Sequence, residues 1–124
     1  MRIAINGTGV AGPTLAWWLR RYGHEPVLFE KAPSLRTGGY VIDFWGVGYD
    51  VAEKMGILPA LHQQDYMLQA LRMLSGKGRT VASLHVSDFR ALLKGRYLSI
   101  ARGDLASTVE DHRPSVETAL TRST

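Results

Sequence analysis

The sequence predicts an α/β fold, because a strand, a glycine-rich turn, a helix and a second strand follow one another within the first 30 residues. The composition agrees with this: 45% of the 124 residues are hydrophobic and 21% are charged, as in ordinary globular domains. Folding of a chain this long hides roughly two thirds of the surface that the unfolded chain exposes. We therefore expect one domain with a real core, built around a parallel βαβ unit.

The first strand and the turn after it carry the main signal. Residues 2–5 form a short apolar run, typical of a buried parallel strand. Gly7, Gly9 and Gly12 follow with the spacing Gly-x-Gly-x-x-Gly. In such turns the first glycine permits the sharp bend, the second lets the backbone approach a pyrophosphate, and the third lets the helix pack on the strand. Pro13 suits the first turn of a helix, where its missing N–H costs nothing.

The helix and the second strand complete the unit. A helix is expected over residues 14–22, ended by Gly23, and a buried strand over residues 26–29. One apolar face of the helix is predicted from the i, i+3, i+4, i+7 spacing of Leu15, Trp18, Leu19 and Tyr22. Glu30 ends the second strand, where a carboxylate can accept both hydroxyls of a ribose. An acid at this position disfavours a 2′-phosphate and hence NADP, but the glycines do not decide between NAD and FAD.

The rest of the chain predicts shorter elements around a hairpin. The expected elements are a loop over 31–48 with an extended piece at 40–44, helices at 49–55 and 59–64, strands at 68–74 and 80–86 joined by a turn at 75–79, a helical turn at 88–93 and a strand at 97–100. Residues 107–124 are rich in Ser and Thr and hold few apolar side chains, so they predict a frayed tail.

Charge and residue content exclude several classes of function. The net charge is +4, but the basic residues form no stripe of the kind that binds nucleic acid. Cysteine is absent, and the four histidines lack the spacing of metal ligands, so no metal site is predicted. No apolar run approaches the roughly 18 residues that a membrane span needs. Because no secretion signal is visible either, the expected location is the cytoplasm.

Three segments resemble one known family. Residues 29–44 resemble the FAD-dependent monooxygenases of the para-hydroxybenzoate hydroxylase type (class A), in which the glycine turn is followed by an acidic–basic pair, an Arg and a glycine-rich loop. Residues 45–56 are similar to the next helix in one bacterial branch, and residues 102–105 look like the family's later Arg-x-x-Leu element. The resemblance covers residues 1 to about 106. It implies the N-terminal part of a Rossmann-like, FAD/NAD(P)-binding fold with a β-hairpin insertion, apparently truncated.

The resemblance also implies a cofactor site and no identified catalytic side chain, since the flavin itself carries the reaction. The implied roles are pyrophosphate binding for Gly7, Gly9 and Gly12, adenosine ribose binding for Glu30, a contact near the adenosine for Lys31, places near the flavin end for Arg36 and Gly39, and a place near the ribityl chain or ring for Arg102.

The function implied is an FAD-dependent, NAD(P)H-reduced hydroxylation of an aromatic or polyketide-like small molecule. Family members are several-fold longer, so the substrate sheet and a later Gly-Asp segment are missing here, and we expect residues 1–106 to be an incomplete FAD-binding domain with an uncovered sheet edge that permits self-association. Residues 107–124 are expected to be disordered or non-homologous. Two alternatives stay open: an inactive remnant that at most binds a dinucleotide, and half of an NAD-dependent dehydrogenase.

Overall fold

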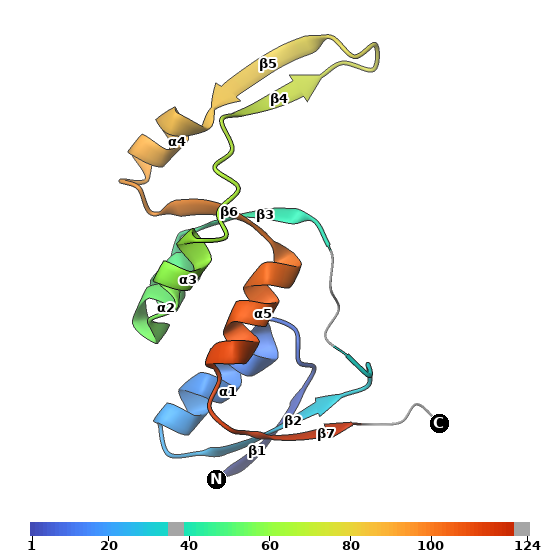
Figure 1. Cartoon of the computed structure of the whole chain (residues 1–124), viewed down its shortest axis with the longest axis vertical. Helices are drawn as coiled ribbons and strands as arrows, with labels where there is room; N and C mark the ends of the chain where they lie inside the picture. Colours follow the sequence, from blue (N-terminus) through green and yellow to red (C-terminus); the bar gives the residue numbers. More distant parts are fainter. Residues whose placement is uncertain (35–38, 121–124) are drawn as a thin grey trace. The chain divides into compact units, whose positions relative to one another are not determined.

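The computed structural model describes residues 1–34 and 39–120 and divides the chain into two compact units (Figure 1). The glycine-turn unit comprises residues 1–40 and 101–124, and the hairpin unit comprises residues 41–100. The predicted single domain, residues 1–106, therefore spans both units. Among the described residues, no helix combines the length and the apolar character needed to cross a bilayer.

A parallel three-stranded sheet forms the base of the glycine-turn unit. Its strands are β1 (Arg2–Asn6), β2 (Glu25–Glu30) and β7 (Glu117–Leu120), in the order β1-β2-β7. All neighbours run parallel, with Ile5 beside Leu28 and Phe29 beside Ala119. Together with α1 (Ala11–Arg21), which connects β1 to β2, this confirms the predicted α/β class and its βαβ core.

The core of this unit contains only part of the predicted helix face. Ile5, Ala16 and Leu28 are buried together, and Leu19 packs against them as predicted. Leu15 and Tyr22, from the same predicted face, are 48% and 71% exposed. The reason is the close approach of α1 to the turn before it. Small residues fill the narrow contact, and the larger side chains are left around its rim.

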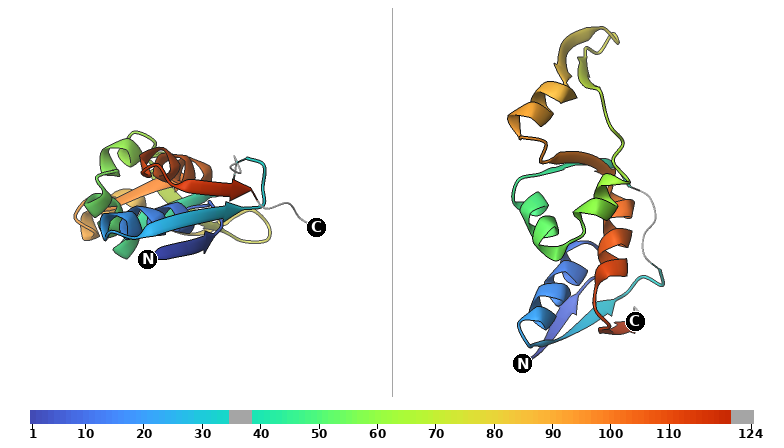
Figure 2. Two further views of the ribbon diagram at one scale, coloured as in Figure 1. Left: turned by 90° about the horizontal axis from the view of Figure 1, so that it is seen from below. Right: turned by 60° about the vertical axis from the view of Figure 1, so that its left-hand side comes forward.

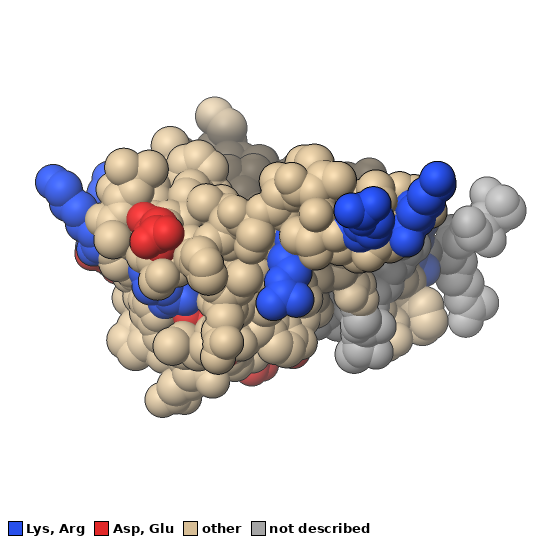
Figure 3. Space-filling view, turned by 90° about the horizontal axis from the view of Figure 1, so that it is seen from above, with Lys and Arg blue, Asp and Glu red and all other residues tan. Residues whose placement is uncertain are grey.

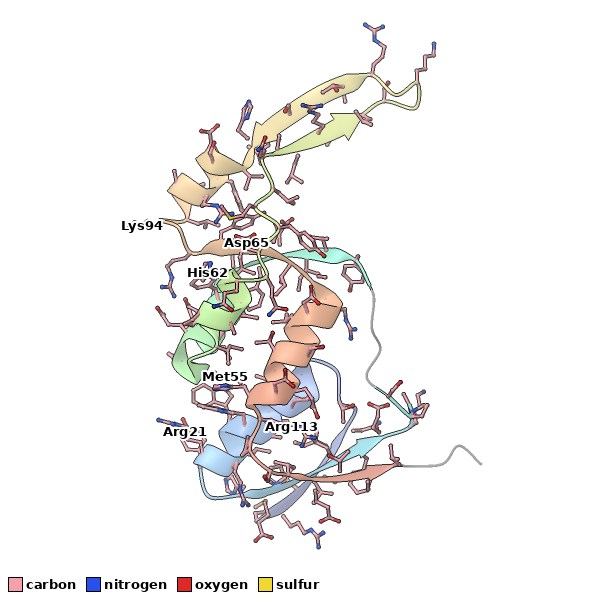
Figure 4. The ribbon with its side chains drawn as sticks, viewed as in Figure 1. Arg21, Met55, His62, Asp65, Lys94 and Arg113 are labelled. Carbon is pink, nitrogen blue, oxygen red and sulfur yellow. The ribbon has the colours of Figure 1, made fainter. Side chains whose placement is uncertain are left out.

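The predicted frayed tail is wrong over most of its length. Helix α5 (Arg102–His112) continues through it, with Thr108 and Val109 buried, and β7 follows. Arg113, labelled in Figure 4, links the end of α5 to β7 by donating to the carbonyl oxygen of Val116 and to Thr118 Oγ1, each at 3.3 Å. Strand β7 lies at the edge of the sheet beside β2 and is mostly exposed, so it buries few apolar side chains.

The hairpin unit contains the other predicted elements with shifted ends. They are β3 (Val41–Trp45), α2 (Val47–Met55), α3 (Leu58–His62), β4 (Ala70–Leu74), β5 (Thr80–His85), α4 (Val86–Leu92) and β6 (Tyr97–Ala101). The strands form two pairs, β3 with β6 and β4 with β5. Figure 2 shows β4 and β5 as a long ribbon closed by a turn, and their pairing is antiparallel, with Leu71 opposite Leu84. The predicted hairpin is therefore confirmed.

Candidate functional site

A cavity of about 180 Å³ lies in the glycine-turn unit at the carboxyl ends of β1 and β2. In open α/β sheets this is the edge at which ligands bind. The walls come from the turn after β1, the end of β2 with the loop that follows, and the first turns of α5. The lining residues are Thr8, Gly9, Glu30, Ala32, Ser34, Arg102 and Ala106.

The three glycines of the turn have three different surroundings. Gly7 has a φ of +98°, a conformation that favours glycine, and its N–H donates to the carbonyl oxygen of Phe29 at 2.7 Å. A Cβ added to Gly12 would overlap with the carbonyl oxygen of Gly7, so this glycine permits the contact between helix and turn. Gly9 faces the cavity, and an added Cβ there would lie 3.3 Å from Nη2 of Arg102.

Glu30 is held as an anion by the turn that faces it. Its Oε1 accepts from the backbone N–H of Ala32, and its Oε2 accepts from both the N–H and the Oγ1–H of Thr8, all at 2.8 Å. These hydrogen bonds, with that from Ala32 the strongest influence, lower the pKa of Glu30 to about 2. The site therefore carries a fixed negative charge at neutral pH.

Arg102 supplies a positive charge on the other side of the cavity. It is the first residue of α5, and its backbone N–H donates to the carbonyl oxygen of Tyr40 at 3.1 Å. The guanidinium lies against Gly9, and a Cβ added to Gly39 would lie 3.5 Å from Cβ of Arg102. The predicted site residues Gly9, Gly39 and Arg102 are thus brought together.

The beginning of α1 adds backbone donors next to the turn. Within the described residues, no side chain caps this helix end and its first turn holds no acid. The hydroxyl of Thr14 donates to the carbonyl oxygen of Val10, and no described side chain accepts from the N–H groups at this helix end. Such an end favours anions through its free N–H groups and the helix dipole.

Two predicted site residues are not part of these contacts. Lys31 is exposed and does not line the cavity, and Arg36 lies outside the described residues. Conversely, sequence reasoning missed Thr8, whose hydroxyl contacts Glu30. The available signal was a hydroxyl residue inside the glycine turn, across from the acid that ends the second strand. In the part of the chain that the structure describes, no group of three potential metal ligands occurs.

Comparison with known sequences identifies relatives along most of the chain, although no family model matches it. A flavin-dependent monooxygenase from an unknown prokaryotic organism is 38% identical over 104 residues, which is 84% of this chain and 27% of that protein. A flavin-dependent monooxygenase from Legionella longbeachae is 33% identical over 105 residues, or 85% and 27%. The FAD-dependent monooxygenase asL4 of Sarocladium schorii is 33% identical over 88 residues, or 71% and 20%.

Solved structures agree with the sequence matches. The tetracycline destructase Tet(55) has a TM-score of 0.74 and 33% identity, over 94% of this chain and 28% of the other. CtdE, solved in complex with FAD and a substrate, has a TM-score of 0.78 over 97% of this chain and 30% of the other, but at 20% identity it supports the fold alone.

These findings define the class of protein as an α/β chain that shares its fold with part of these solved structures. Within that class, the chain is homologous to part of the flavin-dependent monooxygenases, which confirms the resemblance drawn from its motifs. It spans about a quarter of the length of the relatives that it matches.

Proposed function

We propose that this chain is the part of an FAD-dependent monooxygenase that binds the ADP half of FAD. The observation that carries the proposal is the pairing of opposite charges in one cavity: the ionised carboxylate of Glu30 and the guanidinium of Arg102, with the glycine turn between them. A dinucleotide needs this arrangement, because its ribose offers hydroxyl donors and its pyrophosphate offers anionic acceptors.

The pyrophosphate would bind where Gly9 presents no side chain. The N–H groups that begin α1 and the guanidinium of Arg102 are donors for phosphate oxygens, and arginine offers several in a fixed plane. Among the described residues, no ion pair or hydrogen bond engages that guanidinium. We therefore assign Arg102 to the phosphates or the adjoining ribityl chain, and Gly39 to the wall beside it.

The ribose would bind at Glu30, whose low pKa keeps it an acceptor across the physiological range. A 2′-phosphate would meet this negative charge, so NADP would be repelled from the position. Lys31 and Arg36 keep the roles that the resemblance implies, beside the adenosine and toward the flavin end.

The activity of the whole enzyme is inferred from its relatives. When bound, FAD would supply the redox chemistry for inserting oxygen into an aromatic or polyketide-like small molecule, with NAD(P)H as the reductant. Names of the matched sequences favour this over half of an NAD-dependent dehydrogenase. The described residues contribute binding and orientation of the cofactor.

Calorimetric titration with ADP, FAD and FMN tests the proposal. ADP and FAD share the adenosine ribose and pyrophosphate, so both should bind, whereas FMN lacks the adenosine and should bind much more weakly. Arg102→Ala should weaken ADP binding, and Arg79→Ala, an exposed arginine of the hairpin unit, is the matched control. Equal affinities for FMN and ADP would contradict the assignment of the cavity.

A further inference from the structure

Thr8 makes two hydrogen bonds to one oxygen of Glu30. Its backbone N–H and its hydroxyl both donate to Oε2 at 2.8 Å, while the N–H of Ala32 donates to Oε1. Thr8 is only 9% exposed, yet it lines the cavity together with Glu30. The hydroxyl therefore borders the same cavity as the carboxylate that it contacts.

The carboxylate has a limited capacity for donors. Each carboxylate oxygen offers about two lone-pair positions, and Thr8 alone takes two at Oε2. A ribose that donates from its two neighbouring hydroxyls needs an acceptor position on each oxygen. Binding in that way adds a third donor to Oε2, so one of the existing donors has to leave.

The two donors of Thr8 differ in their freedom to move. Its N–H belongs to a turn that the bond from the N–H of Gly7 to the carbonyl oxygen of Phe29 anchors on β2, so it cannot leave without a change in the backbone. The hydroxyl can rotate about its own bonds and take another partner. The hydroxyl is thus the donor that leaves Oε2 of Glu30 when a ribose hydroxyl binds there.

We propose that the hydroxyl of Thr8 is an internal placeholder for a ribose hydroxyl, occupying Oε2 of Glu30 in the free chain and giving up this position when an adenosine diol binds. The inference rests on the proposed function of the cavity. It assigns Thr8 an antagonistic role: the residue satisfies a carboxylate that lacks a ligand and thereby reduces the affinity for the ligand. Thr8 acts through Glu30 and is a specificity-determining residue for vicinal diols.

The test compares Thr8→Val with wild type. The variant keeps the branched shape and the backbone N–H but removes the hydroxyl. Thr108→Val is the matched control, because Thr108 is 8% exposed and its hydroxyl donates to the carbonyl oxygen of Asp104 at 2.8 Å in the same unit. Each protein is titrated with ADP and with 2′,3′-dideoxy-ADP, which keeps the pyrophosphate and lacks the diol. Thermal melting is measured alongside.

We expect Thr8→Val to bind ADP about three- to tenfold more tightly than wild type, the range for a single competing hydrogen bond. The affinity for 2′,3′-dideoxy-ADP should stay unchanged, and Thr108→Val should bind each of the two nucleotides with the affinity of wild type. ADP binding by Thr8→Val that is equal to or weaker than wild type overturns the placeholder while leaving the proposed function intact.

Two further outcomes would also overturn the placeholder. Equal tightening for both nucleotides overturns the placeholder, because the effect would not depend on the diol. If wild type and variant both fail to bind ADP, the proposed function falls and the placeholder falls with it. If Thr8→Val melts below the assay temperature, Thr8→Ala and Thr8→Ser are measured in its place. Tighter ADP binding by Thr8→Ala but not by Thr8→Ser supports the inference, because only serine keeps the hydroxyl. Equal ADP affinities of these two variants overturn it.

Discussion

Gly9 and Gly12 occupy the same turn but differ in what a side chain would meet. A methyl group on Gly12 overlaps with the backbone carbonyl of Gly7, whereas one on Gly9 meets only the flexible end of Arg102. We expect Gly12→Ala to destabilise the fold by about 1–3 kcal/mol, the usual cost of overpacking. Gly9→Ala should melt like wild type, since Gly9 has no positive φ, and should bind ADP more weakly. Melting curves and ADP titrations of both variants check this, and equal melting temperatures would contradict it.

Glu30 gives the stability of the chain a specific dependence on pH. Its pKa is lowered from 4.5 to about 2 in the folded chain, so the ionised form favours folding. That contribution is fully present above the pKa of the unfolded chain and is lost as the pH falls from about 4.5 toward 2. The free energy of unfolding of wild type should therefore drop across this interval more steeply than that of Glu30→Gln. Chemical unfolding at several pH values measures the difference. Parallel curves of unfolding free energy against pH for the two proteins would show that the hydrogen bonds to Glu30 do not stabilise its ionised form.

Asp65 makes polar contacts between elements of the hairpin unit, and Figure 4 labels it near β6. Its side chain is 1% exposed and accepts from the N–H of Ser99 on β6 at 3.0 Å and from Arg90 on α4 at 3.2 Å. Burial alone would raise the pKa of Asp65, but hydrogen bonds from Ser99, Met67 and Arg90 outweigh it and lower the pKa. The carboxylate is thus ionised and fully engaged at neutral pH.

Removal of that carboxylate should loosen the unit. Asp65→Ala leaves the N–H of Ser99 and the guanidinium of Arg90 without this acceptor, at a cost of about 2–4 kcal/mol. The matched control is Asp88→Ala on the exposed side of α4, for which we expect less than about 0.5 kcal/mol. Denaturant unfolding measures both. A loss for Asp65→Ala no larger than for Asp88→Ala would show that the link contributes nothing.

Elements that depend on residues close together in the sequence were predictable. The βαβ unit and the β4–β5 hairpin are encoded in short apolar runs with glycines at the turns, and both are confirmed. Strand β7 was missed because its partner β2 lies almost 90 residues earlier, and no local pattern in residues 117–120 reveals that pairing. Thr8 was missed for the same reason, because its hydroxyl contacts Glu30 only after the turn has folded against the end of β2. The ligand roles of the predicted site residues stay predictions.

The isolated chain exposes many large apolar side chains. The hairpin exposes large apolar side chains, namely Leu71, Met73, Leu74, Val81 and Leu84, and β1 is an edge strand of its sheet. A two-stranded ribbon with an uncovered apolar face is at best marginally stable by itself. On the face in Figure 3 the basic side chains stand in small separate groups with other residues between them.

Self-association is therefore expected at high concentration. Met73→Lys on the hairpin and Ala4→Lys on β1 separate the two surfaces, because an added lysine disfavours pairing at the place where it stands. If the sheet edge is responsible, as the sequence predicted, only Ala4→Lys should shift sedimentation velocity profiles toward the monomer. If only Met73→Lys shifts the profile toward the monomer, the hairpin and not the sheet edge makes the contact. A wild type that stays monomeric at all concentrations would exclude association through either surface.

Catalysis is not expected from the 124-residue chain alone. Its cavity of about 180 Å³ is lined mostly by polar groups, and the chain spans about a quarter of the length of its monooxygenase relatives. Oxygen transfer by a flavin needs a site closed to water, because water otherwise diverts the reactive species. With FAD, NADPH and a panel of phenols, we expect no hydroxylated product, even under conditions in which ADP is found to bind. Product analysis by chromatography, beside the rate of NADPH oxidation, provides the measurement. Substrate-dependent product from the monomeric chain would show that the described elements already enclose a complete active site.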